Sequence, residues 1–151
     1  MTSVDTNLLL PAVERNHASH GLASQWLTRL SADAEVAISE FVLLELYVLL
    51  RNPAVVGTPL TPARAADVCA AFRRHPTWRI VGFPVDSREL HDELWARLRE
   101  PGLARRRAYD LRLALTLRRY GVTDFATVNV KDFEGLGFRR VWNPLSEDAP
   151  S

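Results

Sequence analysis

Three acidic residues lie at positions where an isolated carboxylate would be costly to desolvate. Asp5 follows the short stretch "MTSV" and precedes a run of leucines, Glu45 lies inside "EFVLLELYVLL", and Asp110 lies inside "AYDLRLAL". An ionised carboxylate that leaves water needs a positive partner, because otherwise its neutral form is favoured. The three acids therefore raise the question of which cation they share.

A helical projection places Glu45 and Asp110 on the apolar sides of their segments. The residues that share a side with Glu45 are Phe41, Val42, Val48 and Leu49, opposite a polar stripe of Glu40, Tyr47 and Arg51. Those that share a side with Asp110 are Leu113, Ala114 and Leu117, opposite a solvated stripe of Arg112, Thr116 and Arg119. Two alternatives need no metal. Glu45 could form a core ion pair with an arginine, and Asp110 could cap the start of its helix.

A divalent metal ion would explain all three acids at once if the chain brings them together. Mg²⁺ and Mn²⁺ prefer oxygen ligands, keep several waters and need few carboxylates. The neighbours of the four histidines favour surface or capping roles for His17, His20, His75 and His91. Because the chain has a single cysteine, Cys69, neither a cysteine zinc site nor a disulfide framework can form.

Strand-type and helix-type segments alternate along the chain, which predicts an α/β fold with a parallel sheet of four to five strands, covered on both faces. The predicted strands are residues 2–5, 34–39, 77–83, 123–129 and 138–144. The predicted helices are residues 20–30, 40–51, 62–74, 86–99 and 107–120. Their end signals are Ser39 and Thr61 as N-caps, Pro62 in a first turn, and Gly121 after the last helix.

The order of elements also predicts where a site would form. In open parallel α/β sheets, sites lie outside the carboxyl ends of the strands. Asp5 ends the first predicted strand, while Asn129 and Asp132 follow the fourth. Asp132 has an alternative role as the cap of the turn before Phe133.

Length and composition predict one domain, residues 1–144, followed by a polar C-terminal tail, residues 145–151. The net charge of +1 excludes a global field that would attract nucleic acid or an acidic membrane. No apolar run reaches the about 18 residues that span a bilayer, and no signal peptide is evident. We therefore expect a cytoplasmic protein that does not act at a membrane.

Four stretches in order, "VDTN", "ISEFVLLEL", "AYDLRLAL" and "FATVNVKDF", make the chain resemble the PIN domain, and within it the VapC ribonuclease toxins of bacterial toxin-antitoxin pairs. The resemblance extends from Val4 to about Trp142. It implies a three-layer α/β/α fold and an Mg²⁺- or Mn²⁺-dependent endoribonuclease that a VapB-like antitoxin holds inactive. It also implies that Asp5, Glu45 and Asp110 are the metal ligands.

The sequence departs from the family pattern after the fourth strand. The family commonly has an acid two residues beyond the threonine there, whereas Asn129 stands two residues beyond Thr127. Asp132 could supply the missing charge directly or through water, as a fourth metal ligand and catalytic acid. We expect one firmly held metal ion and a second that arrives with the substrate. Asn7 and Ser39 resemble positions that orient the first acid and a neighbouring water.

Three arginines and two tryptophans are the candidates for contacts with RNA and with protein partners. Just before Asp110 lie three consecutive arginines, Arg105, Arg106 and Arg107, which could contact RNA phosphates. Transfer RNA is one candidate substrate. The alternative is that the three arginines are an ordinary run of solvated charges. Trp26 and Trp95 could serve an antitoxin or a dimer interface, or belong to the core. The family resemblance favours a homodimer whose antitoxin places an arginine near the acids.

Two other functions compete with a ribonuclease. A degenerate PIN module would bind RNA or antitoxin without cutting, which the asparagine at position 129 makes plausible. A haloacid-dehalogenase-like phosphatase also has an aspartate after its first strand, but it needs a second aspartate where this chain has Asn7. Lys131 is the only lysine that such an enzyme could use for phosphate.

Overall fold

The computed structural model describes residues 1–33 and 35–146, which contain five strands and seven helices. The strands are β1 (Thr2–Val4), β2 (Val36–Ser39), β3 (Arg79–Val81), β4 (Asp124–Ala126) and β5 (Arg140–Trp142). The helices are α1 (Thr6–Val13), α2 (His20–Leu30), α3 (Glu40–Leu50), α4 (Pro62–Arg73), α5 (Ser87–Arg97), α6 (Arg107–Arg119) and α7 (Val130–Phe133).

All five strands are parallel and lie in the order β3-β2-β1-β4-β5. The chain builds outward from β1 to β3 on one side and then returns to β4 on the other. The order therefore reverses between β1 and β4, which is the place where parallel sheets bind their ligands. Asp5 directly follows β1 and Thr127 directly follows β4.

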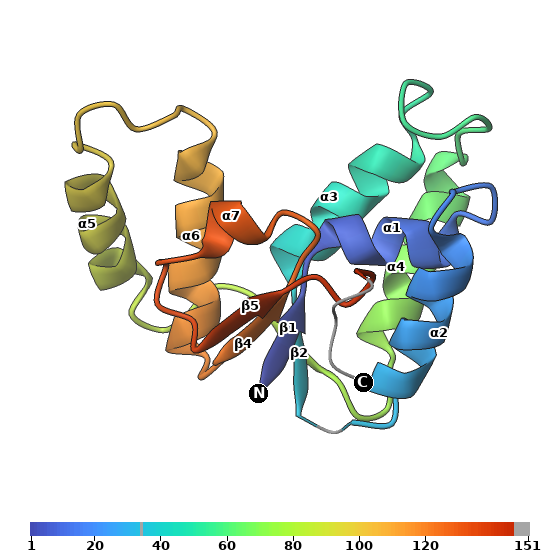
Figure 1. The fold of residues 1–151 in the computed structure, drawn as a ribbon, viewed down its shortest axis with the longest axis horizontal. Coiled ribbons are helices and arrows are strands. Elements are labelled where there is room, and N and C mark those ends of the chain that lie inside the picture. Colours follow the sequence, from blue (N-terminus) through green and yellow to red (C-terminus); the bar gives the residue numbers. More distant parts are fainter. Residues whose placement is uncertain (34, 147–151) are drawn as a thin grey trace.

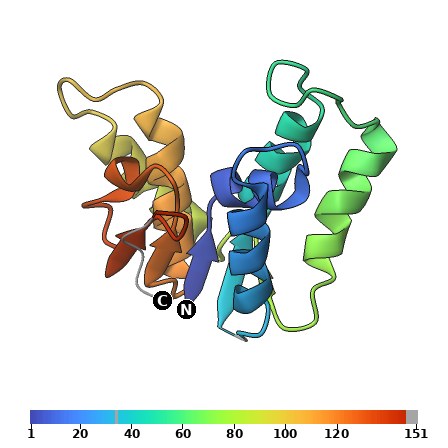
Figure 2. The same ribbon diagram turned by 45° about the vertical axis from the view of Figure 1, so that its right-hand side comes forward.

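Two hydrophobic cores lie on opposite faces of this sheet. Val36 and Ile38 of β2 belong to one core and Ala37 to the other, as the alternation of side chains along a strand requires. Helices α1 to α4 cover the first face, and α5 and α6 cover the second (Figures 1 and 2). The predicted three-layer α/β/α arrangement is confirmed.

Local signals in the sequence account for several helix ends. The Ser39 hydroxyl accepts a hydrogen bond from Phe41 N (3.1 Å) at the start of α3, and the Thr61 hydroxyl accepts one from Arg64 N (3.3 Å) at the start of α4. Gly121 has φ 85°, a conformation that glycine adopts at little cost just after a helix.

Helices α1 and α7 were not among the predicted elements. Pro11 lies inside α1, and a proline removes one backbone donor from a helix, so the segment has a weak helical signal. Burial of Leu8, Leu9 and Leu10 outweighs that cost. In the predicted tail, Leu145 packs against the first core, whereas residues 147–151 lie outside the described residues.

None of the described helices has both the length and the hydropathy to cross a membrane.

Candidate active site

Asp5 is a buried carboxylate at the carboxyl end of β1, with 8% of its surface exposed. Its Oδ1 accepts a hydrogen bond from Thr6 N (2.8 Å), and its Oδ2 accepts one from Thr127 Oγ1 (2.6 Å). The pKa of Asp5 is raised to about 6: burial raises it most, the two hydrogen bonds lower it, and the nearby charges of Glu45 and Asp110 also raise it. Asp5 therefore gains strongly from any cation that approaches it.

Thr127 connects the ends of β1 and β4. Besides donating to Asp5, its hydroxyl accepts hydrogen bonds from Asn7 Nδ2 (3.1 Å) and Asn129 N (3.0 Å). Asn7 Oδ1 in turn accepts from Val128 N (3.1 Å). Asn7 thus acts on Asp5 through Thr127 rather than by touching the carboxylate.

Glu45 lies beside this cluster, but its predicted place in the core is wrong because its side chain is exposed. The buried residues of α3 are Val42, Leu43, Leu46 and Leu50. Val48, which was expected to share the buried side with Glu45, is 56% exposed. Glu45 is held at the site by Thr6, whose hydroxyl donates to Glu45 Oε2 over 2.8 Å.

Asp110 lies in the first turn of α6 and is half-buried. Burial raises its pKa, the negative charges of Asp132 and Glu45 raise it further, and the positive charge of Arg107 lowers it. The predicted solvated stripe of this helix is partly wrong. Thr116 is 3% exposed and donates its hydroxyl to Arg112 O over 2.8 Å.

Asp132 and Asn129 both belong to the segment after β4. Asp132 is exposed in α7, near enough to Asp110 to affect its pKa. Arg107 Nη1 donates to the backbone carbonyl of Asp132. Among residues 1–33 and 35–146 the side chains of Asp132 and Asn129 cap no helix end, so the geometry gives no support to a capping role for Asp132.

Across residues 1–33 and 35–146, the remaining predicted residues make no hydrogen bond to the Asp5 carboxylate. Ser39 is fully buried, and its hydroxyl caps α3 instead of contacting Asp5. Arg105 and Arg106 are exposed just before α6, which begins at Arg107.

The oxygen donors of this cluster fit a hydrated divalent cation better than a closed metal cage. No three His, Cys, Asp or Glu residues in the described part of the chain stand close enough together to hold one ion between them. Mg²⁺, however, keeps most of its waters and is usually held by one or two carboxylates, with further acids acting through water. Asp5, Glu45, Asp110 and Asp132 supply that chemistry, whereas a zinc site would need nitrogen or sulfur ligands.

Sequence reasoning missed the roles of Thr6 and Thr127, which hold the carboxylates of Glu45 and Asp5 in place. Thr6 lies in the motif "VDTN" and Thr127 in "ATVN". The positions of the two threonines in the sequence do not indicate which carboxylate each one binds.

The model of the PIN domain family matches residues 3–137. The chain belongs to the PIN domain family. Within that family it is 45% identical over 148 residues to ribonuclease VapC24 of Mycobacterium tuberculosis, covering 98% of this chain and 99% of the relative. This PIN domain is thus similar to a VapC ribonuclease over nearly the whole length of both chains.

Three solved structures have a similar fold. VapC20 of Mycobacterium tuberculosis, a sarcin-ricin loop cleaving toxin, has TM-score 0.61 and 22% identity, over 83% of this chain and 87% of its own. VapBC2 of Rickettsia felis, bound to a promoter DNA fragment, has TM-score 0.65 and 20% identity, over 94% and 97%. FitAcB of Neisseria gonorrhoeae has TM-score 0.60 and 20% identity, over 95% and 98%. At these identities the likeness supports the fold alone.

Proposed function

We propose that this PIN domain is a Mg²⁺- or Mn²⁺-dependent endoribonuclease and the toxin of a toxin-antitoxin pair. The observation that carries the proposal is the buried carboxylate of Asp5, directly after β1 at the switch point of the sheet. The charges of Glu45 and Asp110 raise its pKa, and Asp132 raises that of Asp110. The near full-length identity to a VapC ribonuclease supports the same activity.

The residues of the proposed site have different roles. Thr127 and Thr6 fix the carboxylates of Asp5 and Glu45 through hydrogen bonds from their hydroxyls. Asp110 and Asp132 add further negative charge, Asp110 acting on Asp5 and Asp132 on Asp110. A divalent ion bound there would lower the pKa of a water and neutralise charge that develops on the phosphorus oxygens. Because the nucleophile is water, no covalent link between protein and RNA is needed.

Arginines at the start of α6 would hold the RNA backbone. Arg107 is anchored to the carbonyl of Asp132, next to the acids, and Arg105 and Arg106 are exposed in the preceding loop. A guanidinium binds phosphate oxygens in a fixed geometry, so these residues would position the RNA without selecting a base sequence.

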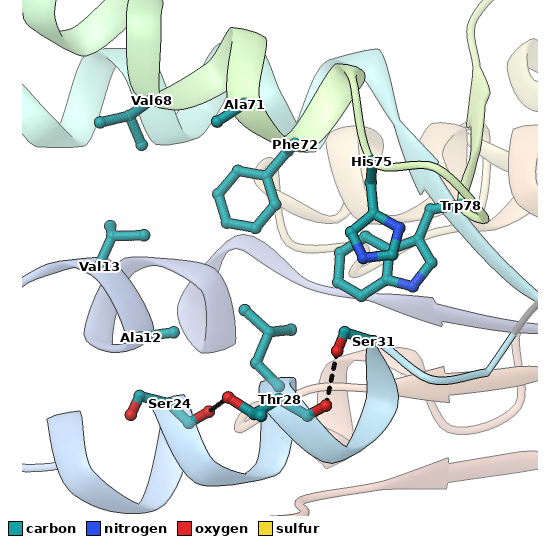
Figure 3. A pocket seen from close by; sticks show the side chains of 11 residues that line it. Ala12, Val13, Ser24, Thr28, Ser31, Val68, Ala71, Phe72, His75 and Trp78 are labelled. Atoms are coloured by element: carbon teal, nitrogen blue, oxygen red, sulfur yellow. Dashed lines mark hydrogen bonds between the residues drawn. The ribbon is translucent and has the colours of Figure 1, made fainter.

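An apolar groove between α1, α2 and α4 is our proposed site for a VapB-like antitoxin (Figure 3). It has a volume of about 480 Å³ and its walls include Val13, Leu27, Val68 and Phe72. His75 stacks on Trp78 at one end, with ring centroids 4.2 Å apart. Such a groove suits the apolar face of a helical peptide.

The homodimer and the cytoplasmic location stay predictions. Trp95 on α5 is 67% exposed and is the most exposed of the four tryptophans, which supports an association surface there. Trp26, by contrast, packs against the first core and so belongs to the fold.

A cleavage assay on RNA tests the proposed activity. Wild-type protein should cut RNA with Mg²⁺ and lose the activity in EDTA, while Asp5→Asn and Asp110→Asn should cut at least about 100-fold more slowly, since each removes a charge from the cluster. Glu40→Gln is the matched control, because Glu40 pairs with Arg73 away from the site.

Each alternative function has its own outcome. Binding of RNA by the wild type without any metal-dependent cutting would mean a degenerate PIN module. Equal cutting by wild type and both variants would place the activity elsewhere. Membership of the PIN domain family removes the phosphatase alternative.

A further inference from the structure

A second group of side chains lies along the same edge of the sheet, beyond the carboxylates. Phe41 follows β2 in the first turn of α3, and Phe83 follows β3. Adjacent strands are about 4.8 Å apart, so the end of β3 lies about 10 Å from the end of β1. Phe41 also precedes Glu45 by one helical turn. The Phe41 ring therefore lies one helical turn from Glu45, and the Phe83 ring contacts that of Phe41.

Arg112 of α6 joins these rings. Its guanidinium carbon lies 3.9 Å from the centroid of the Phe41 ring and 5.6 Å from that of Phe83. Its Nε donates to His91 Nε2 (3.1 Å), while His91 Nδ1 lies 2.6 Å from Ser87 O. The histidine thus holds one edge of the guanidinium.

The opposite edge of this guanidinium is free to bind. Across residues 1–33 and 35–146, no carboxylate lies within salt-bridge distance of Arg112, and its Nη atoms make no hydrogen bond. A half-buried arginine without an acid is a ready partner for a phosphate oxygen.

Phe83 is exposed but firmly placed. Its side chain is 70% exposed, and its ring meets that of Phe41 edge to face, with centroids 6.1 Å apart. Tyr120 Oη donates to Phe83 O over 2.8 Å, and Arg119 pairs with Asp86 in the same loop. An exposed aromatic ring on an anchored backbone loses little entropy when a flat ligand stacks on it.

We propose that Phe83, Phe41 and Arg112 form a subsite for an unpaired nucleobase and its phosphate in the RNA substrate. Single-stranded RNA is bound by stacking bases on aromatic rings and by arginines on its backbone, and both groups are present here. The subsite rests on the proposed ribonuclease function and deepens it, because it names how a nucleotide next to the cut would be held.

Binding of a labelled single-stranded oligoribonucleotide in EDTA tests the subsite without cleavage. Phe83→Ala should weaken binding about 5- to 100-fold, whereas Phe83→Trp should retain it. An oligonucleotide with abasic positions should bind wild type and Phe83→Ala alike. Val85→Ala is the matched control, since Val85 is fully exposed in the same loop and has no ring.

Arg112→Gln should weaken binding of both oligonucleotides and flatten the dependence of log affinity on log salt by about 0.7. Wild-type affinity in both Phe83→Ala and Arg112→Gln, in a protein that does cut RNA, would overturn the subsite alone. A wild type that neither binds nor cuts RNA would instead overturn the proposed function. A smaller mass of Phe83→Ala by light scattering would assign this surface to a second copy of the chain and also overturn the subsite.

Discussion

Thr127 Oγ1 donates a hydrogen bond to Asp5 Oδ2 over 2.6 Å, between residues 122 positions apart in the chain. A hydroxyl has one proton to give, and Thr127 also accepts from the side chain of Asn7 and the backbone of Asn129. Those two donors leave the proton of Thr127 directed at Asp5. The carboxylate is therefore held as an acceptor before any ion arrives.

Thr127→Val should damage the site while keeping nearly the same side-chain shape. A hydrogen bond to a charged group contributes about 1.5 to 3 kcal/mol, so its loss should raise the pKa of Asp5 by about 1 to 2 further units. Because less of Asp5 is then ionised, we expect RNA cleavage at pH 7 to fall by about 2- to 10-fold and the acidic limb of the pH–rate profile to move upward. Thr127→Ser should keep the wild-type profile. An unshifted profile in the valine variant would contradict this role.

The metal-free protein should lose stability as the pH rises from about 4 to about 6. The pKa of Asp5 is about 6 in the folded chain and 3.8 when exposed, so in this window the folded state binds more protons than the unfolded state. The free energy of unfolding should fall by on the order of 2 kcal/mol across it. The raised pKa of Asp110 acts in the same direction. Urea unfolding in EDTA at several pH values measures this.

The variant Asp5→Asn tests whether titration of Asp5 causes this loss of stability. An amide does not titrate, so most of the pH dependence between about 4 and 6 should disappear in the variant. Asp124 does not interfere, because Arg139 lowers its pKa and moves its contribution below pH 3.8. A variant that keeps the full slope would show that other groups titrate there.

Mg²⁺ should stabilise the wild type at pH 7. At about 100 times Kd the gain is about 2.7 kcal/mol, which corresponds to a rise in Tm of about 5 to 10 °C for a domain of this size. Glu45→Gln should reduce the rise, whereas Glu40→Gln, on the same helix, should leave it unchanged. Differential scanning calorimetry measures the Tm of each variant with and without Mg²⁺. An equal rise in Tm in the two variants would show that Glu45 does not bind the ion.

The fold was largely predictable because its signals are local. Alternating strand and helix segments determine the layers, and the caps Ser39 and Thr61 mark where two helices begin. The two missed helices have weaker signals, although Asp5 caps the start of α1. Pro11 weakens α1, and α7 has only 4 residues. Both depend on tertiary packing, which no short window of sequence contains.

The site was only partly predictable, for a different reason. Asp5 is explained by its strand end, but the helix of Glu45 is apolar on almost every side, so its buried face could not be chosen from periodicity. Which face of this helix is buried depends on which of its residues pack against the sheet. The hydroxyls of Thr6 and Thr127 find their carboxylates only through the folded chain.

Asn129→Asp should strengthen metal binding, because it restores the acid that the family commonly has at this position. The side chain of Asn129 is exposed and caps no helix end, so the substitution breaks no contact of that kind. Its backbone N donates to Thr127 and is unaffected. An added carboxylate beside a divalent ion should lower the Mg²⁺ concentration for half-maximal cleavage about 3- to 10-fold. Titration of cleavage rate against Mg²⁺ measures it.

Asp132→Asn provides the opposite change in the same segment. Asp132 raises the pKa of Asp110, so it is close enough to contribute charge to a bound ion. If it replaces the missing acid, its loss should raise the half-maximal Mg²⁺ concentration, and adding Asn129→Asp should restore it. If Asp132→Asn behaves as wild type while Asn129→Asp binds tighter, then position 129 alone sets the charge of the second metal position and Asp132 plays no part.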